Sequence, residues 1–393
     1  MAIALGSIAR RVGLIAGTLG LVAGVGIAGA TPRVAAELTG SPLVFGVVGA
    51  PAGPEGSSSW GQAMEAYVKY WNSQGGYKGH RIELDVVNAA EDPSDAADAA
   101  RQLVSVDNVL ALVANFNVID CFVNTGYYAS IPIAVVNAQA SSACTFDRKV
   151  DFELINPDGT INLSVLVKWA HSHGVTKFGT LNPQIPELAH ETAQLSAYAK
   201  KLSHKSVVNT TVPITATAAD YDGAIVQMKA QGVKAVLGLE ITPLVIQEAN
   251  RQGFGPANGI KWFTLGFSSA TPAATLPGVY AVSSYYPFGT NYPGIKAATK
   301  ILKAGNVSPL DVTAASGYQG IIQLRSALNL VKGPVTRASL LEALGRQKNF
   351  QVPLTPLIAH PSNPVTNPEG GFVYEAKGNN WVQVSQFITV LKP

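Results

Sequence analysis

The amino-acid sequence predicts an α/β protein with two lobes, each a doubly wound parallel sheet, joined by several strands that form a hinge. Three observations predict this fold. From residue 42 onward, short β-rich runs alternate with longer amphipathic runs, an order typical of parallel sheets with helices on both faces. The alternation comes in two sets, at residues 42–157 and 158–282. The length of 393 residues also fits two domains of roughly 100–200 residues each.

The first set contains four predicted strands and three predicted helices. The strands are Leu43–Val48, Arg81–Asn88, Val109–Val113 and Ile131–Val136, and the helices are Ser57–Asn72, Ser94–Ser105 and Val118–Tyr128. On the first helix, Trp60, Met64, Tyr67 and Trp71 recur at helical spacing and therefore form one apolar face. The second helix follows Asp92-Pro93, which is a typical helix start.

The second set repeats the pattern. Its strands are Lys177–Leu181, Val207–Val212, Lys234–Leu239 and Trp262–Gly266, and its helices are Thr160–His173, Glu187–Leu202, Asp220–Gln231 and Pro243–Gln252. We interpret Asp220 and Asp222 as carboxylates that satisfy free backbone N–H groups at the start of a helix.

A third block follows, too small for a domain of its own. It consists of a strand at Val279–Tyr285, helices at Tyr292–Ala304, Val312–Val331 and Thr336–Gly345, and a hairpin of Phe372–Ala376 with Trp381–Val390. We expect this block to complete the other two. The predicted first lobe is 42–157 plus 283–352, and the predicted second lobe is 158–282 plus 353–393. Several strands between two lobes predict a hinge and a cleft that closes.

Residues 1–30 resemble a cleavable secretory signal peptide. A short basic leader ends at Arg11, an apolar stretch covers Val12–Ala30, and Ala28-Gly29-Ala30 is typical of a cleavage site. The alternative is an uncleaved membrane anchor, which the glycines in this stretch disfavour. Arg10-Arg11 leaves twin-arginine export open as an alternative to the general route. We therefore expect a soluble protein exported to a periplasm.

Composition excludes some functions and predicts one cross-link. Charged residues are only 13% of the chain, and the longest basic clusters, such as Arg10-Arg11 and Lys200-Lys201, contain only two residues, so we expect no nucleic-acid binding. Cys121 and Cys144 are the only cysteines, and in an oxidising compartment they are expected to form a disulfide. Two buried free thiols are the alternative. Two cysteines are too few for a thiolate-rich metal site.

The motifs predict no catalytic, cofactor or metal site. The pattern G-x-G-x-x-G occurs at Gly24–Gly29, but it lies inside the signal segment and no strand precedes it. The sequence contains no nucleophile elbow. His171 and His173 stand two residues apart at a helix end, where capping is the simpler interpretation than metal binding. We therefore expect a protein that is not an enzyme.

The loops that follow the predicted strands are candidates for a small-molecule site, because ligands bind at the carboxyl ends of parallel strands. In the first lobe these loops are Gly49–Trp60, Ala114–Asn117 and Asn137–Ser142, and in the second they are Asn182–Glu187, Glu240–Thr242 and Gly266–Ser269. Backbone N–H groups at helix starts suit a carboxylate, and Trp60 and Phe116 would supply apolar walls. Ordinary turn chemistry is the alternative for each loop.

Four stretches resemble the type I periplasmic solute-binding proteins of the branched-chain amino acid (Leu/Ile/Val-binding) group, which serve ABC importers. They are Phe45–Ala50 with Gly53-Pro54, the N-x-x-G-G-x-x-G-like Trp71–Gly79, Asp220-Tyr221 with Gln231–Val236, and Ala249–Phe254. The resemblance covers residues 42–390. It implies a Venus-flytrap fold and a monomer that delivers a small-molecule ligand to an ABC permease.

The resemblance also implies a ligand site, in which one lobe holds the ligand carboxylate and the other closes over its amino group. By position, the first-lobe contacts are Trp60, Phe116, Asn117, Gln139, Ala140 and Ser141, and the second-lobe contacts are Glu187, Glu240, Phe267 and Ser268. The chain departs from the family pattern. Asn115-Phe116-Asn117 replaces a serine-rich turn, Glu187 replaces a tyrosine, and Phe267 or Ser268 stands where the family has an acid. A buried α-ammonium would lack its charge partner. An aromatic or other small carboxylate, or an amide, is therefore expected alongside amino-acid-like ligands.

The resulting hypothesis is an extracytoplasmic solute-binding protein that captures a small molecule between two lobes and delivers it to an ABC importer. The alternative is a ligand-sensing receptor of the same fold that feeds a signalling partner. An enzyme is the third possibility, and it would need a nucleophile–base pair or a metal site, neither of which the sequence contains.

Overall fold

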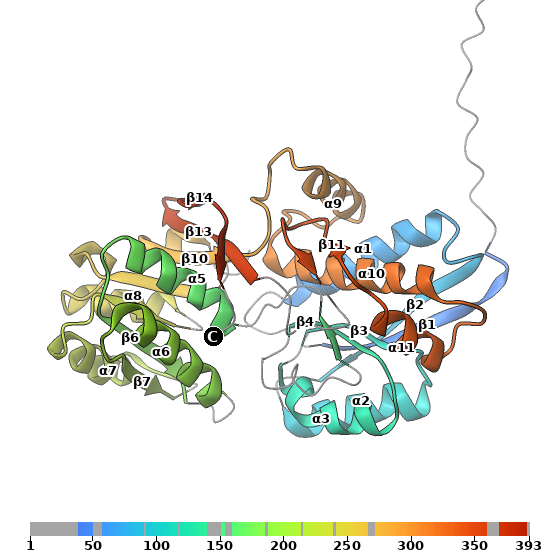
Figure 1. Ribbon diagram of the computed structural model, residues 1–393, viewed down its shortest axis with the longest axis horizontal. Helices are drawn as coiled ribbons and strands as arrows, with labels where there is room; N and C mark the ends of the chain where they lie inside the picture. The colour runs from blue at the N-terminus through green and yellow to red at the C-terminus, as the bar shows by residue number, and fades with distance from the viewer. Residues whose placement is uncertain are drawn as a thin grey trace, which may run out of the picture. The chain divides into compact units, whose positions relative to one another are not determined.

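The computed structural model describes residues 38–49, 57–89, 92–116, 118–139, 151–153, 159–184, 188–213, 215–238, 241–265, 272–359 and 369–390. The predicted signal peptide lies outside these residues. Two large sheets organise the described part of the chain (Figure 1). We call each sheet, with the helices that cover it, the first and the second lobe.

The first lobe is built on a five-stranded parallel sheet in the order β2-β1-β3-β4-β5. The strands are β1 (Gly40–Gly49), β2 (His80–Asn88), β3 (Leu112–Phe116), β4 (Val135–Gln139) and β5 (Asp151–Glu153). Strand β1 thus has β2 on one side and β3 on the other. This is the topological switch point of the sheet, where connections leave toward opposite faces.

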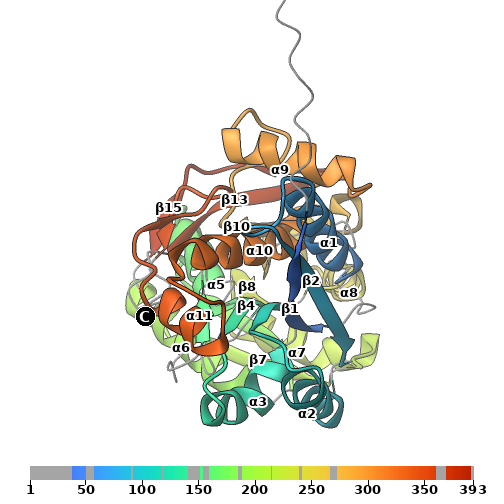
Figure 2. The same ribbon diagram turned by 90° about the vertical axis from the view of Figure 1, so that its right-hand side faces the viewer.

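Helices cover both faces of the first sheet. They are α1 (Ser57–Ser73), α2 (Pro93–Arg101), the π-helical turn η1 (Gln102–Val106), α3 (Val118–Ser130), α9 (Pro293–Ala304), α10 (Val312–Leu330) and α11 (Arg337–Gly345). Helices α1 and α10 pack side by side on one face, and α2 packs against α3 on the other (Figures 1 and 2). The chain therefore covers its first sheet partly with helices from the far end of the sequence.

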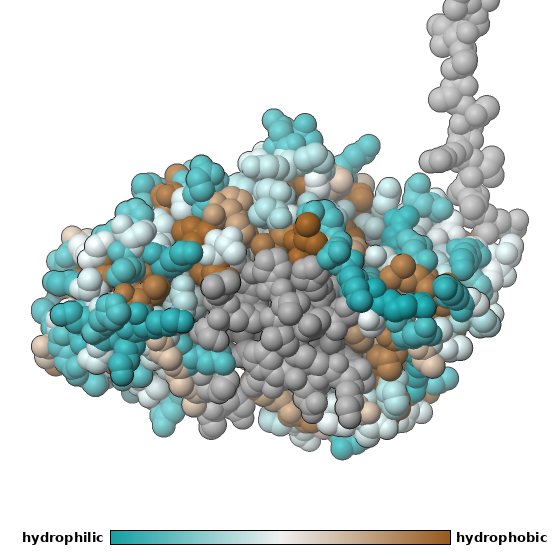
Figure 3. Space-filling model, in the orientation of Figure 1, coloured by the Kyte–Doolittle hydropathy of each residue, from teal (hydrophilic) through white to brown (hydrophobic). Residues whose placement is uncertain are grey.

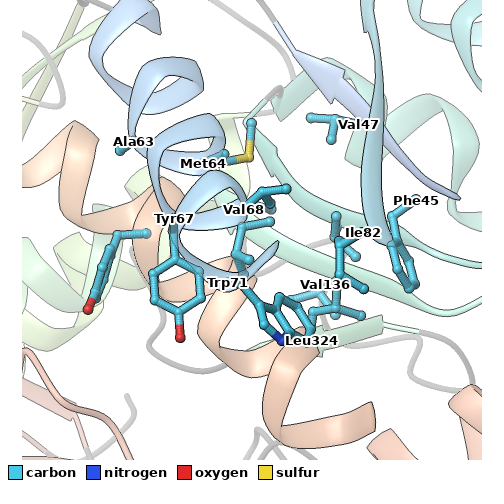
Figure 4. Close-up of a cluster of buried hydrophobic side chains, with 14 of the residues drawn as sticks. Phe45, Val47, Ala63, Met64, Tyr67, Val68, Trp71, Ile82, Val136 and Leu324 are labelled. Atoms are coloured by element: carbon cyan, nitrogen blue, oxygen red, sulfur yellow. The ribbon is translucent and has the colours of Figure 1, made fainter. Parts of the chain in front are cut away.

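The predicted apolar face of α1 forms the core of the first lobe. Met64 and Trp71 are essentially buried and belong to one cluster with Phe45 of β1 and Leu324 of α10 (Figure 4). The Trp71 indole N–H donates a hydrogen bond to the Gly76 carbonyl at 3.0 Å, so its one polar atom is satisfied. The sequence prediction for this helix is confirmed, because helical spacing placed one continuous stripe toward the sheet.

The second lobe is built on an eight-stranded sheet in the order β14-β13-β10-β9-β8-β6-β7, with β15 paired to β13. The strands are β6 (Phe178–Pro183), β7 (Val208–Val212), β8 (Ala235–Leu237), β9 (Lys261–Leu265), β10 (Val279–Ser283), β13 (Glu369–Lys377), β14 (Asn380–Gln383) and β15 (Ile388–Val390). The first five are mutually parallel, and β13 to β15 extend them in antiparallel pairs.

Among the described residues, four α-helices flank this second sheet. They are α5 (Gly159–Ser172), α6 (Leu188–Ser203), α7 (Ala218–Ala230) and α8 (Pro243–Arg251), together with the short turns η2 (Pro256–Asn258) and η3 (Ala273–Thr275). Helices α5 and α6 cover one face, while α7 and α8 cover the other. The α/β prediction with two doubly wound parallel sheets is confirmed.

The chain passes between the two lobes three times. Strands β1–β5 belong to the first sheet and β6–β10 to the second, α9–α11 pack into the first hydrophobic core, and β13–β15 return to the second sheet. Between the last two groups, the short pair β11 (Phe350–Gln351) and β12 (Ile358–Ala359) precedes the return. Leu354 in this segment packs into the first core. The lobe boundaries predicted from the sequence remain a prediction.

Some element boundaries differ from the sequence prediction. Strands β3 and β4 begin at Leu112 and Val135, several residues after the predicted starts at Val109 and Ile131. Val109 and Ile133 are buried against α2, η1 and α3 without being in a strand, so the apolar run is longer than the strand. The short strands β5, β11 and β12 were not predicted, because two or three residues carry no periodicity.

The interpretation of the two aspartates in α7 is half right. Thr217 caps the helix, and its backbone N–H donates to Asp220 Oδ2 at 2.7 Å, a bond that lowers the pKa of Asp220. Asp222 is not a cap. It accepts hydrogen bonds from Arg251 (3.0 Å) and Gln252 (2.7 Å), because it lies more than one turn into the helix and faces α8.

The surface is mixed in character. On the face shown in Figure 3, hydrophobic residues lie in small groups between hydrophilic ones. Single exposed apolar residues such as Val106 and Val226 are ordinary for a protein surface. Within the described ranges, no helix combines the length and apolar character needed to cross a bilayer.

Candidate functional site

The carboxyl ends of β1, β3 and β4 lie side by side at the switch point of the first sheet. Gly49 at the end of β1 pairs with Phe116 at the end of β3, and Phe116 pairs with Gln139 at the end of β4. The backbone therefore brings together two of the predicted ligand-contact positions, Phe116 and Gln139. This edge of an open parallel sheet is where ligands bind in such folds.

Trp60 lies at this edge, in the first turn of α1. Its side chain is 1% exposed, and its indole N–H donates a hydrogen bond to the Ala114 carbonyl of β3 at 2.9 Å. The ring lies against Gly49, where a Cβ atom would collide with it. Trp60 therefore packs against the ends of both β1 and β3. These described contacts are with the protein itself.

Strand β3 carries a bulge just before its end. Between the pairs Gly46–Leu112 and Gly49–Phe116, β3 has one more residue than β1. Ala114 has a φ of +51°, a left-handed conformation that costs a non-glycine residue about 1–2 kcal/mol. Bulges of this kind change the direction of a strand and re-aim the residues that follow.

A buried polar network supports the bulge. Asn115 is fully buried; its Oδ1 accepts from the Val48 backbone N–H of β1 (3.0 Å), and its Nδ2 donates to Asp120 Oδ2 (2.9 Å). Asp120 Oδ1 accepts from Asn124 Nδ2 (2.8 Å) and from the Tyr128 hydroxyl (2.6 Å). Burial raises the pKa of Asp120 to about 6, and the hydrogen bonds from Tyr128, Asn124 and Asn115 oppose that rise.

The second sheet has a comparable edge. Strands β6, β8 and β9 are neighbours in the sheet, and β6 has β7 on its other side, so the switch point lies between β6 and β8. The predicted contacts Glu187, Glu240, Phe267 and Ser268 follow these three strands in the sequence. Near this edge, Thr264 Oγ1 accepts from the Ile241 backbone N–H at 3.3 Å. Asn182 Nδ2 donates to Thr192 Oγ1 at 2.9 Å.

The predicted site residues are described to different extents. Trp60 is described with its side chain, and Phe116 and Gln139 are described as strand residues by their backbone only. The remaining predicted contacts lie outside the described residues: Asn117, Ala140, Ser141, Glu187, Glu240, Phe267 and Ser268. Cys121 lies buried on α3, whereas Cys144 lies outside the described residues, so the disulfide remains a prediction.

Two buried residues that support the ends of β1 and β3, Asn115 and Asp120, were not identified from the sequence. Asp120 was included only as part of a predicted helix, and Asn115 only as part of a turn. A signal was present, since an amide inside an apolar strand and an acid in the first turn of an apolar helix both need buried partners. The pairing itself, however, depends on the bulge.

Side chains that could hold a metal do not gather in the described part of the chain, where no group of three or more His, Cys, Asp or Glu residues occurs. His173 follows α5, and its ring Nδ1 lies 2.7 Å from the Trp169 carbonyl oxygen. This confirms the capping interpretation for His173.

Comparisons with known proteins agree with this architecture. A family profile described as periplasmic binding protein matches residues 42–378. No curated protein matches the sequence. Among solved structures, a possible leucine/isoleucine/valine-binding protein from Rhodopirellula baltica SH 1 is similar, with a TM-score of 0.76 at 17% identity, covering 91% of this chain and 98% of that one.

Two further solved structures show the same fold with ligands bound. A solute-binding protein of an ABC transporter from R. palustris, in complex with 4-hydroxybenzoate, has a TM-score of 0.74 at 14% identity, covering 90% of this chain and 98% of that one. A branched-chain amino acid ABC transporter protein from Thermus thermophilus, with bound valine, has a TM-score of 0.75 at 14% identity, covering 90% and 97%. The family match spans most of the chain and confirms the resemblance seen in the sequence. This chain therefore belongs to the periplasmic binding protein family and has the type I fold of the leucine/isoleucine/valine-binding group.

Proposed function

We propose that this protein is an extracytoplasmic solute-binding protein that captures a small molecule between its lobes and delivers it to an ABC permease. The observation that carries the proposal is the family match over residues 42–378. Two parallel sheets of the same strand order support it, because each supplies a switch-point edge suited to one half of a ligand site. Closure of the lobes would turn ligand binding into a shape that a permease recognises.

The proposed site combines the two edges. The first-lobe half contains Trp60, Phe116, Asn117, Gln139, Ala140 and Ser141, and the second-lobe half contains Glu187, Glu240, Phe267 and Ser268. The register of β1, β3 and β4 supports the first half, since it aligns the strand ends from which these residues follow. Neighbouring positions of β6, β8 and β9 support the second half in the same way.

The proposed ligand is a small carboxylate, aromatic or amino-acid-like, or an amide. Relatives of the same fold bind valine and 4-hydroxybenzoate, which share a carboxylate on an apolar body. Backbone N–H groups at helix starts suit that carboxylate. Phe267 and Ser268 carry no negative charge for an α-ammonium, so within this half only Glu187 and Glu240 could pair with one.

The proposal includes export and a cross-link. Residues 1–30 would act as a cleaved signal peptide, placing a monomeric protein in the periplasm. In that oxidising compartment Cys121 and Cys144 would form a disulfide. Mass spectrometry of the exported protein should show a chain that begins after Ala30 and is two hydrogens lighter than the reduced form. Two titratable thiols in the native protein would contradict the disulfide.

Calorimetric titration of the purified protein tests the central proposal. The ligands are valine, isoleucine, benzoate, 4-hydroxybenzoate and benzamide, and we expect one chemical class to bind with micromolar or tighter affinity. The bound compound should be recovered unchanged, and small-angle scattering should show compaction on binding. Chemical conversion of any compound would contradict the proposal, as would no binding across the panel and no scattering change.

A matched pair of variants tests the site. Phe116→Ala should weaken the binding of the best ligand by at least tenfold, because it removes an apolar wall. Val226→Ala, at an exposed position on α7, is the control and should leave affinity unchanged. Equal affinity in both variants would contradict the first-lobe half of the site.

A further inference from the structure

The bulged end of β3 is held in place from three directions. The Trp60 indole N–H donates to the Ala114 carbonyl oxygen from α1. Gly320 of α10 approaches Ala114 so closely that a Cβ atom on this glycine would collide with it. The Asn115 side chain ties the strand to β1 through Val48. A left-handed alanine persists only where its surroundings determine the backbone, and here they do so at the edge of the proposed ligand site.

The orientation of the Asn115 amide is fixed by its neighbour in β1. The Val48 backbone N–H can only donate, so the atom of Asn115 that faces it must be the oxygen. The NH2 group of Asn115 therefore points away from β1, toward Asp120, and requires an acceptor there. A carboxylate is such an acceptor.

The other oxygen of Asp120 also faces donors. Asn124 Nδ2 donates to Oδ1 and also to the Ala96 carbonyl of α2 (2.9 Å), which fixes the orientation of that amide too. The Tyr128 hydroxyl donates to the same oxygen. Two fixed NH2 groups thus face Asp120 from opposite sides. Only a side chain that accepts at both of its terminal atoms satisfies them, and a carboxylate does so where an amide does not.

We propose that Asp120 is a positioning residue for ligand binding: its carboxylate locks the Asn115 amide, which joins the ends of β1 and β3 and so sets the direction in which the chain leaves Phe116. The inference rests on the proposed function. Asp120 is 1% exposed and acts through Asn115. Displacement of the strand end would move the binding groups out of register with the ligand, which lowers affinity even though no contact residue changes.

Exchanging the two side chains provides a direct test. Asp120→Asn keeps the shape, but in either orientation its NH2 group faces the fixed NH2 group of Asn115 or of Asn124. In the orientation that keeps the bonds from Asn124 and Tyr128 to Oδ1, the new NH2 group faces the NH2 group of Asn115, which then has no acceptor there. In the double variant Asn115→Asp with Asp120→Asn, the new carboxylate accepts from Val48 and from the new amide, whose oxygen accepts from Asn124 and Tyr128. The exchange restores the four donor–acceptor pairs described above, from Val48, between residues 115 and 120, from Asn124 and from Tyr128, and it conserves charge.

The experiment measures two quantities on the full chain: the dissociation constant for the tightest binder of the panel above, and amide hydrogen exchange of residues 112–116. We expect Asp120→Asn to weaken binding about tenfold and to accelerate exchange of this segment, the size of effect of one mispaired buried donor. The double variant should recover both values to within about threefold of the wild-type protein. Thr210→Val, which removes a buried 2.6 Å bond to Thr180 in the second lobe, is the matched control and should change neither.

The outcomes separate this inference from the proposed function. Unchanged affinity and exchange in Asp120→Asn would overturn the inference, as would a folded double variant that fails to recover. If Asp120→Asn does not fold, the double variant decides alone by comparison with the wild type. If no panel compound binds the wild-type protein, the proposed function is contradicted, and recovery of hydrogen exchange then decides the inference by itself.

Discussion

The two sheets share a strand order but stabilise their ligand-side edges with different chemistry. The parallel part of the second sheet runs β7-β6-β8-β9-β10, which repeats the order β2-β1-β3-β4-β5 of the first. In the first sheet the third strand is bulged and tied to a buried carboxylate, Asp120. In the second, the described pairs of β8 follow regular register, and neutral groups such as Asn182 and Thr192 pair near the end of β6 at 2.9 Å.

The difference shows that two sheets with the same strand order can preorganise their strand ends to different degrees. Replacing one member of a neutral hydroxyl–amide pair lowers the free energy of unfolding only modestly, because the remaining group can form a hydrogen bond with another partner. A buried carboxylate between two oriented amides has no substitute of the same shape. We therefore expect single substitutions to perturb the edge of the first lobe more than that of the second, and the following predictions rank that difference by size.

The largest effect is expected for two of the buried tryptophans, Trp60 in the first lobe and Trp262 in the second. Trp60 and Trp262 are both essentially buried, and each donates its indole N–H to a carbonyl, of Ala114 and of Phe254. Replacing either by Ala should lower the free energy of unfolding by about 3–5 kcal/mol, because it leaves a large cavity. Urea denaturation followed by circular dichroism measures this loss.

Replacement by Phe distinguishes the two tryptophans. Trp60→Phe should also weaken ligand binding, because it releases the Ala114 carbonyl at the bulge, whereas Trp262→Phe should lower stability alone. Titration calorimetry at a temperature where both variants are folded provides the comparison. Equal affinities would show that the bond from Trp60 to Ala114 does not support the ligand-side edge of the first sheet.

The next largest effect concerns pH. The pKa of Asp120 is raised by burial from 3.8 to about 6, so the unfolded chain releases this proton at lower pH than the folded protein. The contribution of Asp120 to the free energy of unfolding is therefore fully present below about pH 4. It falls by about 3 kcal/mol as the pH rises through 6. Subtracting the urea-unfolding profile of Asp120→Asn from that of the wild type, between pH 4 and 7, isolates this contribution. A flat difference would contradict it.

A smaller effect is expected for helical glycines. Gly320→Ala should destabilise the protein by about 1–3 kcal/mol, because the new methyl group collides with Ala114. Gly223→Ala on α7 of the second lobe meets open space and should stabilise by about 0.5–1 kcal/mol, as Ala favours helix. Thermal unfolding of both variants tests this contrast of sign.

The smallest effect is expected in the second sheet. Thr210→Val removes the bond from Thr210 Oγ1 to the Thr180 carbonyl and should cost about 1 kcal/mol. Denaturant unfolding measures the loss. A cost as large as that of the tryptophan variants would mean that hydrogen bonds within the second sheet are as hard to replace as the large buried side chains.

The sequence was sufficient to predict the fold because most elements carry a strong periodic or alternating pattern. The stripe of Met64, Tyr67 and Trp71 and the cap before α2 needed no knowledge of tertiary contacts. Strand starts at β3 and β4 were wrong, because buried apolar residues such as Val109 also occur in loops.

The bulge at Ala114 and the contacts that hold it could not be predicted from the sequence. The left-handed Ala114 depends on Trp60, 54 residues earlier in the chain, and on Gly320, on a helix near the other end. No local pattern marks an alanine for positive φ, since intrinsic preference opposes it. The loops after the strands were predicted as ligand contacts from topology alone, and the register of Phe116 with Gln139 agrees with that reasoning.

The position of α10 in the sequence has a consequence for biosynthesis. This helix, at Val312–Leu330, covers the apolar face of α1, but a chain made from its N-terminus completes β1 to β5 long before α10 emerges. Until then Met64, Trp71 and Phe45 lack the buried neighbours, such as Leu324, that α10 supplies. A nascent chain with this order of elements is therefore expected to keep an incomplete first core, and to depend on chaperones, until its last quarter is synthesised.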